Sequence, residues 1–179
     1  MHWYNYVNDD AKVAFVLTLT ERVIDKLVNY RWYSQIRETM NMCWEWVEGK
    51  KYRGDELYDQ LEDDEDQGLF VVYIEEIDCE MPVSGDPQVK QVFDCVLYAA
   101  ACATRQAYVY DGELNHCPQT VNIAHDEFID EVFMEEIKKV DGYQEEWAER
   151  LKQYLMKNHP AGRDKKMKRE ELLNLIAQK

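Results

Sequence analysis

The sequence contains few of the residues that interrupt regular structure, with four prolines and seven glycines among its 179 residues. An all-β sandwich needs a turn about every ten residues, so this scarcity argues against that class. An apolar content of 46%, with twelve tyrosines and five tryptophans, excludes a disordered chain. The length suits one domain with a single core.

Targeting and membrane signals are also missing. No apolar run reaches the length of about 18 residues that a membrane span requires. Residues 1–6 show no basic segment followed by an apolar one, so they do not resemble a signal peptide. The cysteines are odd in number, and three of the five fall in apolar helical patterns, which is typical of small buried side chains in a reducing compartment. We therefore expect a cytoplasmic protein.

Basic residues are scarce in the middle of the chain. Residues 55–149 carry four Lys/Arg against twenty-six Asp/Glu, whereas residues 1–54 carry eight against seven and residues 150–179 nine against three. The run from Asp55 to Asp66 has eight carboxylates and no base. Such a surface repels a phosphate backbone and attracts a basic protein. The pattern predicts a basic protein partner and no direct nucleic-acid binding; a solvated acidic surface without a partner is the alternative.

Motifs for catalysis or metal binding are absent. There is no Gly-x-Ser-x-Gly, no phosphate-binding glycine loop and no paired Glu-x-x-His, and His116-Cys117 with His125 lacks a supporting ligand pattern. An EF-hand alignment of the acidic run fails, because Ile74 stands where a bidentate glutamate is needed. We assign no catalytic residue, no cofactor and no native metal site; weak surface binding of calcium stays open.

Apolar residues recur at helical spacing through most of the chain. The run Leu69–Ile74 suits a strand or a helix, and we favour a helix because the chain offers no second strand of similar character to pair with it. Such a helix places Leu69, Phe70, Tyr73, Ile74 and Ile77 on one face. Gly49 stands where a left-handed residue is expected to end a helix. The other predicted helices cover about residues 8–30, 34–48, 55 onward, 87–110, 123–140 and 143–157.

The helix over residues 87–110 has few charges and many Ala and Cys residues, so we expect it to be central. Residues 163–179 are basic at their start and apolar at their end, which fits a peripheral helix or a frayed tail. The prediction is one all-α, bundle-like domain over residues 1–179, with seven or eight helices around the Ala/Cys-rich one. Cys43, Trp44 and Val47 lie in one apolar stripe, and we interpret them as core rather than as a ligand pocket.

Residues 42–51, Met-Cys-Trp-Glu-Trp-Val-Glu-Gly-Lys-Lys, and residues 54–58, Gly-Asp-Glu-Leu-Tyr, resemble the Imm6 family of bacterial immunity proteins. The chain length and the alanine-rich residues 98–103 also fit, so the resemblance extends to about Leu155. It implies a cytoplasmic antidote from a polymorphic toxin or contact-dependent inhibition system, which binds a toxin domain, often a nuclease. An acidic inhibitor can occupy the basic cleft of a nuclease as a phosphate mimic.

The resemblance marks no individual binding residue, so charge alone selects the candidates. Two alternatives stay open: a helical adaptor for another basic protein, and a metal-dependent helical-bundle enzyme. The predicted partner-binding residues are Asp59, Glu62, Asp63, Asp64, Asp66, Asp126, Glu127, Asp130 and Glu131.

Overall fold

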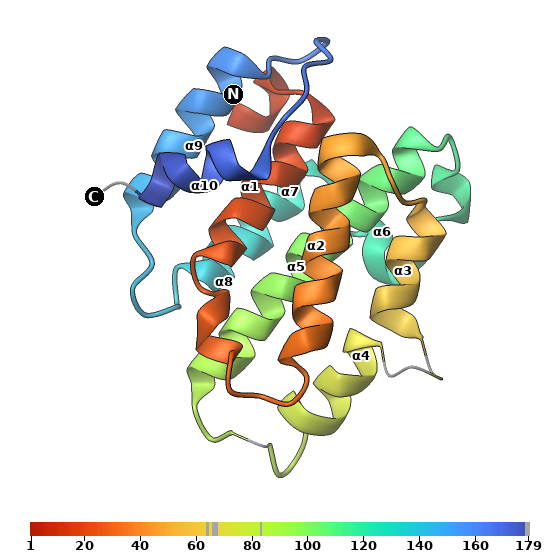
Figure 1. The fold of residues 1–179 in the computed structure, drawn as a ribbon, viewed down its shortest axis with the longest axis vertical. Helices are drawn as coiled ribbons and strands as arrows, with labels where there is room; N and C mark the ends of the chain where they lie inside the picture. Colours follow the sequence, from red (N-terminus) through yellow and green to blue (C-terminus); the bar gives the residue numbers. More distant parts are fainter. Residues whose placement is uncertain (64, 66–67, 83, 178–179) are drawn as a thin grey trace.

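The computed structural model describes residues 1–63, 65, 68–82 and 84–177, and these form an all-α protein (Figure 1). The described residues contain no strand, and a single isolated bridge joins Val7 to Pro160. The predicted fold class is therefore confirmed. Leu69–Ile74 is helical, as favoured over a strand.

The elements follow one another with short connections. The first half contains η1 (Trp3–Tyr6), α1 (Asp9–Glu21), η2 (Ile24–Leu27), α2 (Tyr33–Gly49), α3 (Gly54–Glu62), α4 (Leu69–Val72) and the π-helical η3 (Tyr73–Ile77). The second half contains α5 (Pro87–Tyr110), η4 (Leu114–His116), α6 (Gln119–Asn122), α7 (Asp126–Phe128), the π-helical η5 (Ile129–Phe133), α8 (Met134–Ile137), α9 (Glu145–Asn158) and α10 (Arg169–Ala177).

Two π-helical turns join short α-helices into longer ones. If α4–η3 and α7–η5–α8 each count as one helix, the described residues form nine α-helices, against seven or eight predicted. The additional one is α6, which lies in a stretch expected to be a loop.

The centre of the fold is formed by α1 and α5, which pack against each other (Figure 1). The helix α5 also contacts α2, α3, α6 and α8, as expected for the central Ala/Cys-rich helix. Its Ala99, Ala100 and Ala103 are at most 1% exposed, and small residues there let neighbouring helices approach closely. The helix α1 is equally central, because every residue from Ala11 to Thr20 is buried.

The predicted first helix is too long. It ends at Glu21 rather than near Tyr30, because Arg22 and Val23 donate to carbonyls three residues back and the chain turns into η2. The turn keeps Ile24 buried and leaves Val28, which falls within the predicted helix, 54% exposed.

The left-handed residue at the end of α2 is Lys50, with φ 52°, and not Gly49 as expected. A left-handed conformation costs a non-glycine residue about 1–2 kcal/mol. Tertiary contacts of Lys50 offset this cost. Its Nζ lies 2.6 Å from Asp10 Oδ2 and 4.2 Å from the centroid of the Trp46 ring.

The tryptophans of α2 are core residues, as predicted for Trp44: Trp44 and Trp46 are each 1% exposed. All five cysteines are free, and Cys43, Cys95 and Cys102 are buried. Burial raises the pKa of Cys43 and of Cys102 to about 12, so both stay protonated at neutral pH.

Residues 169–177 form α10, which packs against α9 and α1. Its Leu172 and Ile176 are at most 1% exposed. Within the described residues, no helix is long and apolar enough to cross a membrane.

Candidate interaction surface

The first acidic run lies on and after α3, whose start is fixed against the end of α5. The Gly54 amide donates to Asp111 Oδ2 at 3.0 Å, and Glu56 Oε2 accepts from the Arg53 amide at 2.8 Å. A Cβ at Gly54 would lie 2.6 Å from the Tyr108 ring, so glycine is what allows α3 to approach α5 this closely. Leu57 and Leu61 are then buried, and the acidic face of α3 points outward.

Among the predicted binding residues of this run, Asp59 and Glu62 are exposed. They are three residues apart, so they share one face of α3. Asp63 is half-buried, and its carboxylate accepts the Glu65 amide at 2.9 Å. Asp64 and Asp66 lie outside the described residues. The chain then returns over the end of α3, where the Gly68 amide donates to the Asp63 carbonyl.

In the second acidic run, on α7 and η5, two carboxylates bind side chains near the N-terminus of the chain. Asp126 Oδ2 lies 2.7 Å from Lys12 Nζ, and Asp130 Oδ1 accepts from the Trp3 indole at 3.1 Å. Burial alone would lower the pKa of Lys12, but its hydrogen bonds to Asp126 and Asp9 outweigh burial and raise it. Asp126 and Asp130 therefore stabilise the fold itself.

The other two carboxylates of this run are exposed. The Oε2 atom of Glu127 lies 2.8 Å from His125 Nδ1, within hydrogen-bond distance. Glu131 is exposed to solvent. Hydrogen bonding to its own backbone amide and to His125 lowers the pKa of Glu127. Burial raises the pKa of Tyr4, and the negative charges of these four carboxylates raise it further.

The first run borders an apolar groove, which sequence reasoning missed. This groove, here called the Ile74–Ile123 groove, has a volume of about 550 Å³. It lies where the end of α3 meets α4–η3 and α6, and the Tyr58 hydroxyl lies 3.2 Å from Thr120 Oγ1 across the same helices. Its lining residues are Glu62, Phe70, Val71, Tyr73, Ile74, Thr120 and Ile123.

Ile74 was expected in the core and is instead 65% exposed. Leu69, Val72 and Glu76 are spaced three and four residues apart and face inward. Ile74 lies two residues from both Val72 and Glu76, which places it on the opposite side of the helix. Glu76 takes an inner position on η3, where it pairs with Arg31. A usable signal was present in the sequence, since residues 69–74 contain more apolar side chains than one helix face can bury.

A second cavity, of about 380 Å³, lies between the start of α1, the end of α2 and residues 161–164. Lys50 and Asp10 both line it and pair with each other at 2.6 Å.

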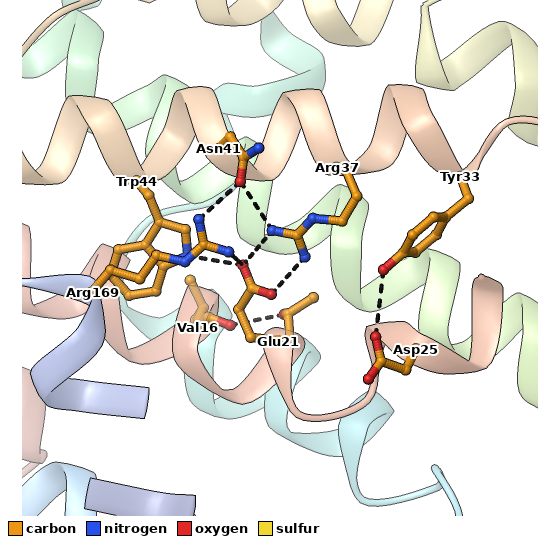
Figure 2. Close-up of polar contacts among 9 residues, drawn as sticks. Val16, Glu21, Asp25, Tyr33, Arg37, Asn41, Trp44 and Arg169 are labelled. Carbon is orange, nitrogen blue, oxygen red and sulfur yellow. Dashed lines mark hydrogen bonds and ion pairs between the residues drawn. The ribbon is translucent and has the colours of Figure 1, made fainter. Parts of the chain in front are cut away.

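A buried charge cluster ties α1, α2 and α10 together (Figure 2). The Glu21 side chain is 8% exposed and accepts from Arg37 at 2.6 and 3.0 Å, from Arg169 at 2.7 Å and from the Trp44 indole at 3.1 Å. Asn41 Oδ1 accepts from both arginines, at 3.0 and 2.8 Å. Both Glu21 oxygens are occupied, so this carboxylate positions α10 and is poorly placed to act as a general base.

The described residues contain no group of three or more His, Cys, Asp or Glu side chains arranged to hold a metal ion. The exposed carboxylates of α3 and the apolar groove beside them form the candidate interaction surface.

The sequence model of one protein family, described as "Immunity protein Imm6", matches residues 11–140 of the chain. This range runs from the start of α1 to just past α8, and so includes α3, both acidic runs and the Ile74–Ile123 groove. No curated protein and no solved structure matches the chain.

Proposed function

Because the chain belongs to the Imm6 family of immunity proteins, we propose that it binds a cognate bacterial toxin domain and neutralises it without chemistry of its own. The family match carries this proposal, since it covers most of the chain and both acidic runs.

We further propose that the protein acts in the cytoplasm and that its target is a basic toxin domain, a nuclease in particular. The net charge of −15 supports this, because an acidic inhibitor is drawn to a basic cleft and can occupy the place of the phosphate backbone. The mechanism is steric and electrostatic occlusion, with association that slows as salt rises.

The carboxylates after Arg53 are the better candidates for this contact. Asp59 and Glu62 are exposed on one face of α3, whereas Asp126 and Asp130 already hold Lys12 and Trp3. A partner that drew Asp126 and Asp130 away would weaken the attachment of the N-terminal segment. The predicted set thus divides into a first group, Asp59, Glu62, Asp63, Asp64 and Asp66, and a second group in which Glu127 and Glu131 are the available members.

The test is protection from a toxin. The toxin domain encoded by the gene immediately upstream is expressed in a susceptible bacterium, with and without this protein, and growth is recorded. The purified pair is then examined by titration calorimetry. Protection together with a stoichiometric complex supports the proposal, and failure of both removes it. Binding without protection would favour an adaptor.

The position of the contact is tested by charge reversal. Replacing Asp63, Asp64 and Asp66 by lysine should slow association and leave the fold intact, because in the sequence these residues follow the end of α3 at Glu62. A matched control reverses Glu145, Glu146 and Glu149, three acidic and exposed residues of α9 outside the family match. Equal effects of the two triple variants would show that only overall charge matters.

A further inference from the structure

We propose that the Ile74–Ile123 groove is the docking site of the toxin domain, and that it receives an apolar side chain which the toxin presents between lysine or arginine residues. The inference rests on the proposed function and goes beyond it by assigning the contact to one surface and one chemistry. The acidic residues around the groove speed association with the toxin, and the apolar contact in the groove slows its dissociation.

The Ile74–Ile123 groove leaves apolar side chains exposed to solvent. Ile74 is 65% exposed and Ile123 48% exposed, and both line the same depression. They come from η3 and from the residue after α6, so tertiary structure brings together two apolar side chains that are far apart in the sequence. Single exposed apolar residues are ordinary, but a contiguous apolar depression rimmed by polar groups is typical of an interaction site.

The segment that forms most of the groove is strongly acidic. Residues 54–89, which include all of α3, α4 and η3, contain thirteen Asp or Glu residues and no Lys, Arg or His. Lys90, the next residue, donates to the hydroxyl of the groove residue Tyr73 and is paired with Asp94 at 3.0 Å. Glu62 is part of the groove wall, Asp59 lies on the same face of α3, and Glu75 is exposed beside Ile74. An apolar centre inside a charged rim is the usual anatomy of a protein interface.

The position of these carboxylates on α3 adds to this argument. Asp59 and Glu62 lie in the last turns of the helix, which carries no basic residue there. Each negative charge at the negative end of a helix dipole is unfavourable, and so is the repulsion between the two. Cations of a partner placed at this end would relieve both effects.

The same charges argue against other occupants. A second copy of the chain in a two-fold dimer would bring this acidic face against itself, and like charges in an interface are costly. An anionic membrane surface would be repelled for the same reason. The basic C-terminal segment of the chain is held elsewhere, with Arg169 bound to Glu21. A basic partner with an apolar anchor remains the occupant that fits.

The experiment separates the two contributions by kinetics. The apolar contribution is removed by the double variant Ile74→Ser and Ile123→Ser, and the charge contribution by Asp59→Asn and Glu62→Gln. Binding to the upstream-encoded toxin domain is measured by surface plasmon resonance at several salt concentrations. Val28→Ser is the control for the first pair, because Val28 is 54% exposed and outside the groove. Glu38→Gln is the control for the second, on the exposed face of α2.

Truncating two central anchors of an interface should weaken affinity by on the order of 100-fold. For the isoleucine pair we expect this loss in the dissociation rate, with the salt dependence unchanged. For the carboxylate pair we expect slower association and a shallower salt dependence. Unfolding in urea should be close to wild type for every variant, since the replaced side chains are exposed.

Each outcome has a definite meaning. If the wild type binds and protects while the isoleucine variant binds equally well, the docking site is elsewhere and the proposed function stands. If the wild type neither binds nor protects, the proposed function fails, and the inference fails with it. If the free protein is a dimer by light scattering and Ile74→Ser makes it monomeric, the groove is a self-interface and the inference is overturned.

Discussion

The cluster around Glu21 gives the most direct test of how the helices are held together. Replacing Glu21 by Gln keeps the shape of the side chain but removes the charge that two guanidinium groups share (Figure 2). The amide nitrogen of the new side chain would also face N–H donors. Removing one partner of a buried charge pair costs about 3–5 kcal/mol. Because the Arg37 and Arg169 side chains are still 23% and 28% exposed, water can take over part of the lost contact, and the low end of this range applies.

A loss of about 3 kcal/mol can be measured by equilibrium unfolding in urea. With a slope of about 2 kcal/mol per molar, the midpoint should fall by about 1.5 M. The control Glu38→Gln makes the same chemical change at an exposed position and should stay within about 0.5 kcal/mol of wild type. A double-mutant cycle between Glu21→Gln and Arg169→Gln should give a coupling of about 1–3 kcal/mol.

Amide hydrogen exchange then identifies the helix whose local stability requires the Glu21 cluster. Glu21 is the charged partner of Arg169 at the start of α10, so amides of residues 169–177 should exchange faster in Glu21→Gln than in the control. A variant as stable as wild type, or with unchanged exchange in α10, would refute the assignment of this cluster as the attachment of α10.

Three further predictions follow from burial. Trp44→Ala should lower the free energy of unfolding by about 3–5 kcal/mol in the same urea assay, as a large-to-small core change; wild-type stability would show that Trp44 is not core. Burial lowers the pKa of His159 below its usual 6.5, so the unfolded chain binds a proton that the folded chain does not, and stability should fall as pH drops below about 6.5. His159→Gln should reduce this slope, and parallel pH profiles of the two proteins would contradict it. A thiol reagent at pH 8 should modify Cys79 and Cys117 in the folded protein and reach Cys43, Cys95 and Cys102 only after denaturation; early labelling of a third cysteine would contradict the buried assignments.

Much of the helical architecture could be read from local patterns. The spacing of apolar residues marked α2, α5 and α9. In the structure, the Asp86 side chain caps the start of α5 by accepting the Gln88 amide. These signals are visible in sequence because a helix and its cap are made by residues a few positions apart. The acidic character of α3 was equally clear, and it led to Asp59 and Glu62, which the structure exposes.

The sequence predictions are wrong at positions where contacts between residues far apart in the sequence determine burial or backbone conformation. Val28 falls within a predicted helix but is exposed, because the chain turns after Glu21 into η2. Ile74 is exposed because residues 69–77 bury the face that carries Val72 and Glu76. Lys50 adopts the left-handed conformation expected of Gly49, since Asp10 and the Trp46 ring hold it there. Asp126 looks like a surface carboxylate in sequence, but Lys12 pairs with it.

By itself, therefore, the sequence determined the helices, the charge and the apolar centre of this protein, because these depend on composition and on spacing within one helix. Tertiary structure alone decided which carboxylates are available, how Arg169 reaches Glu21 across 148 residues, and that Ile74 and Ile123 form one groove beside Glu62. These features depend on how the helices pack against each other, and no local pattern records that packing.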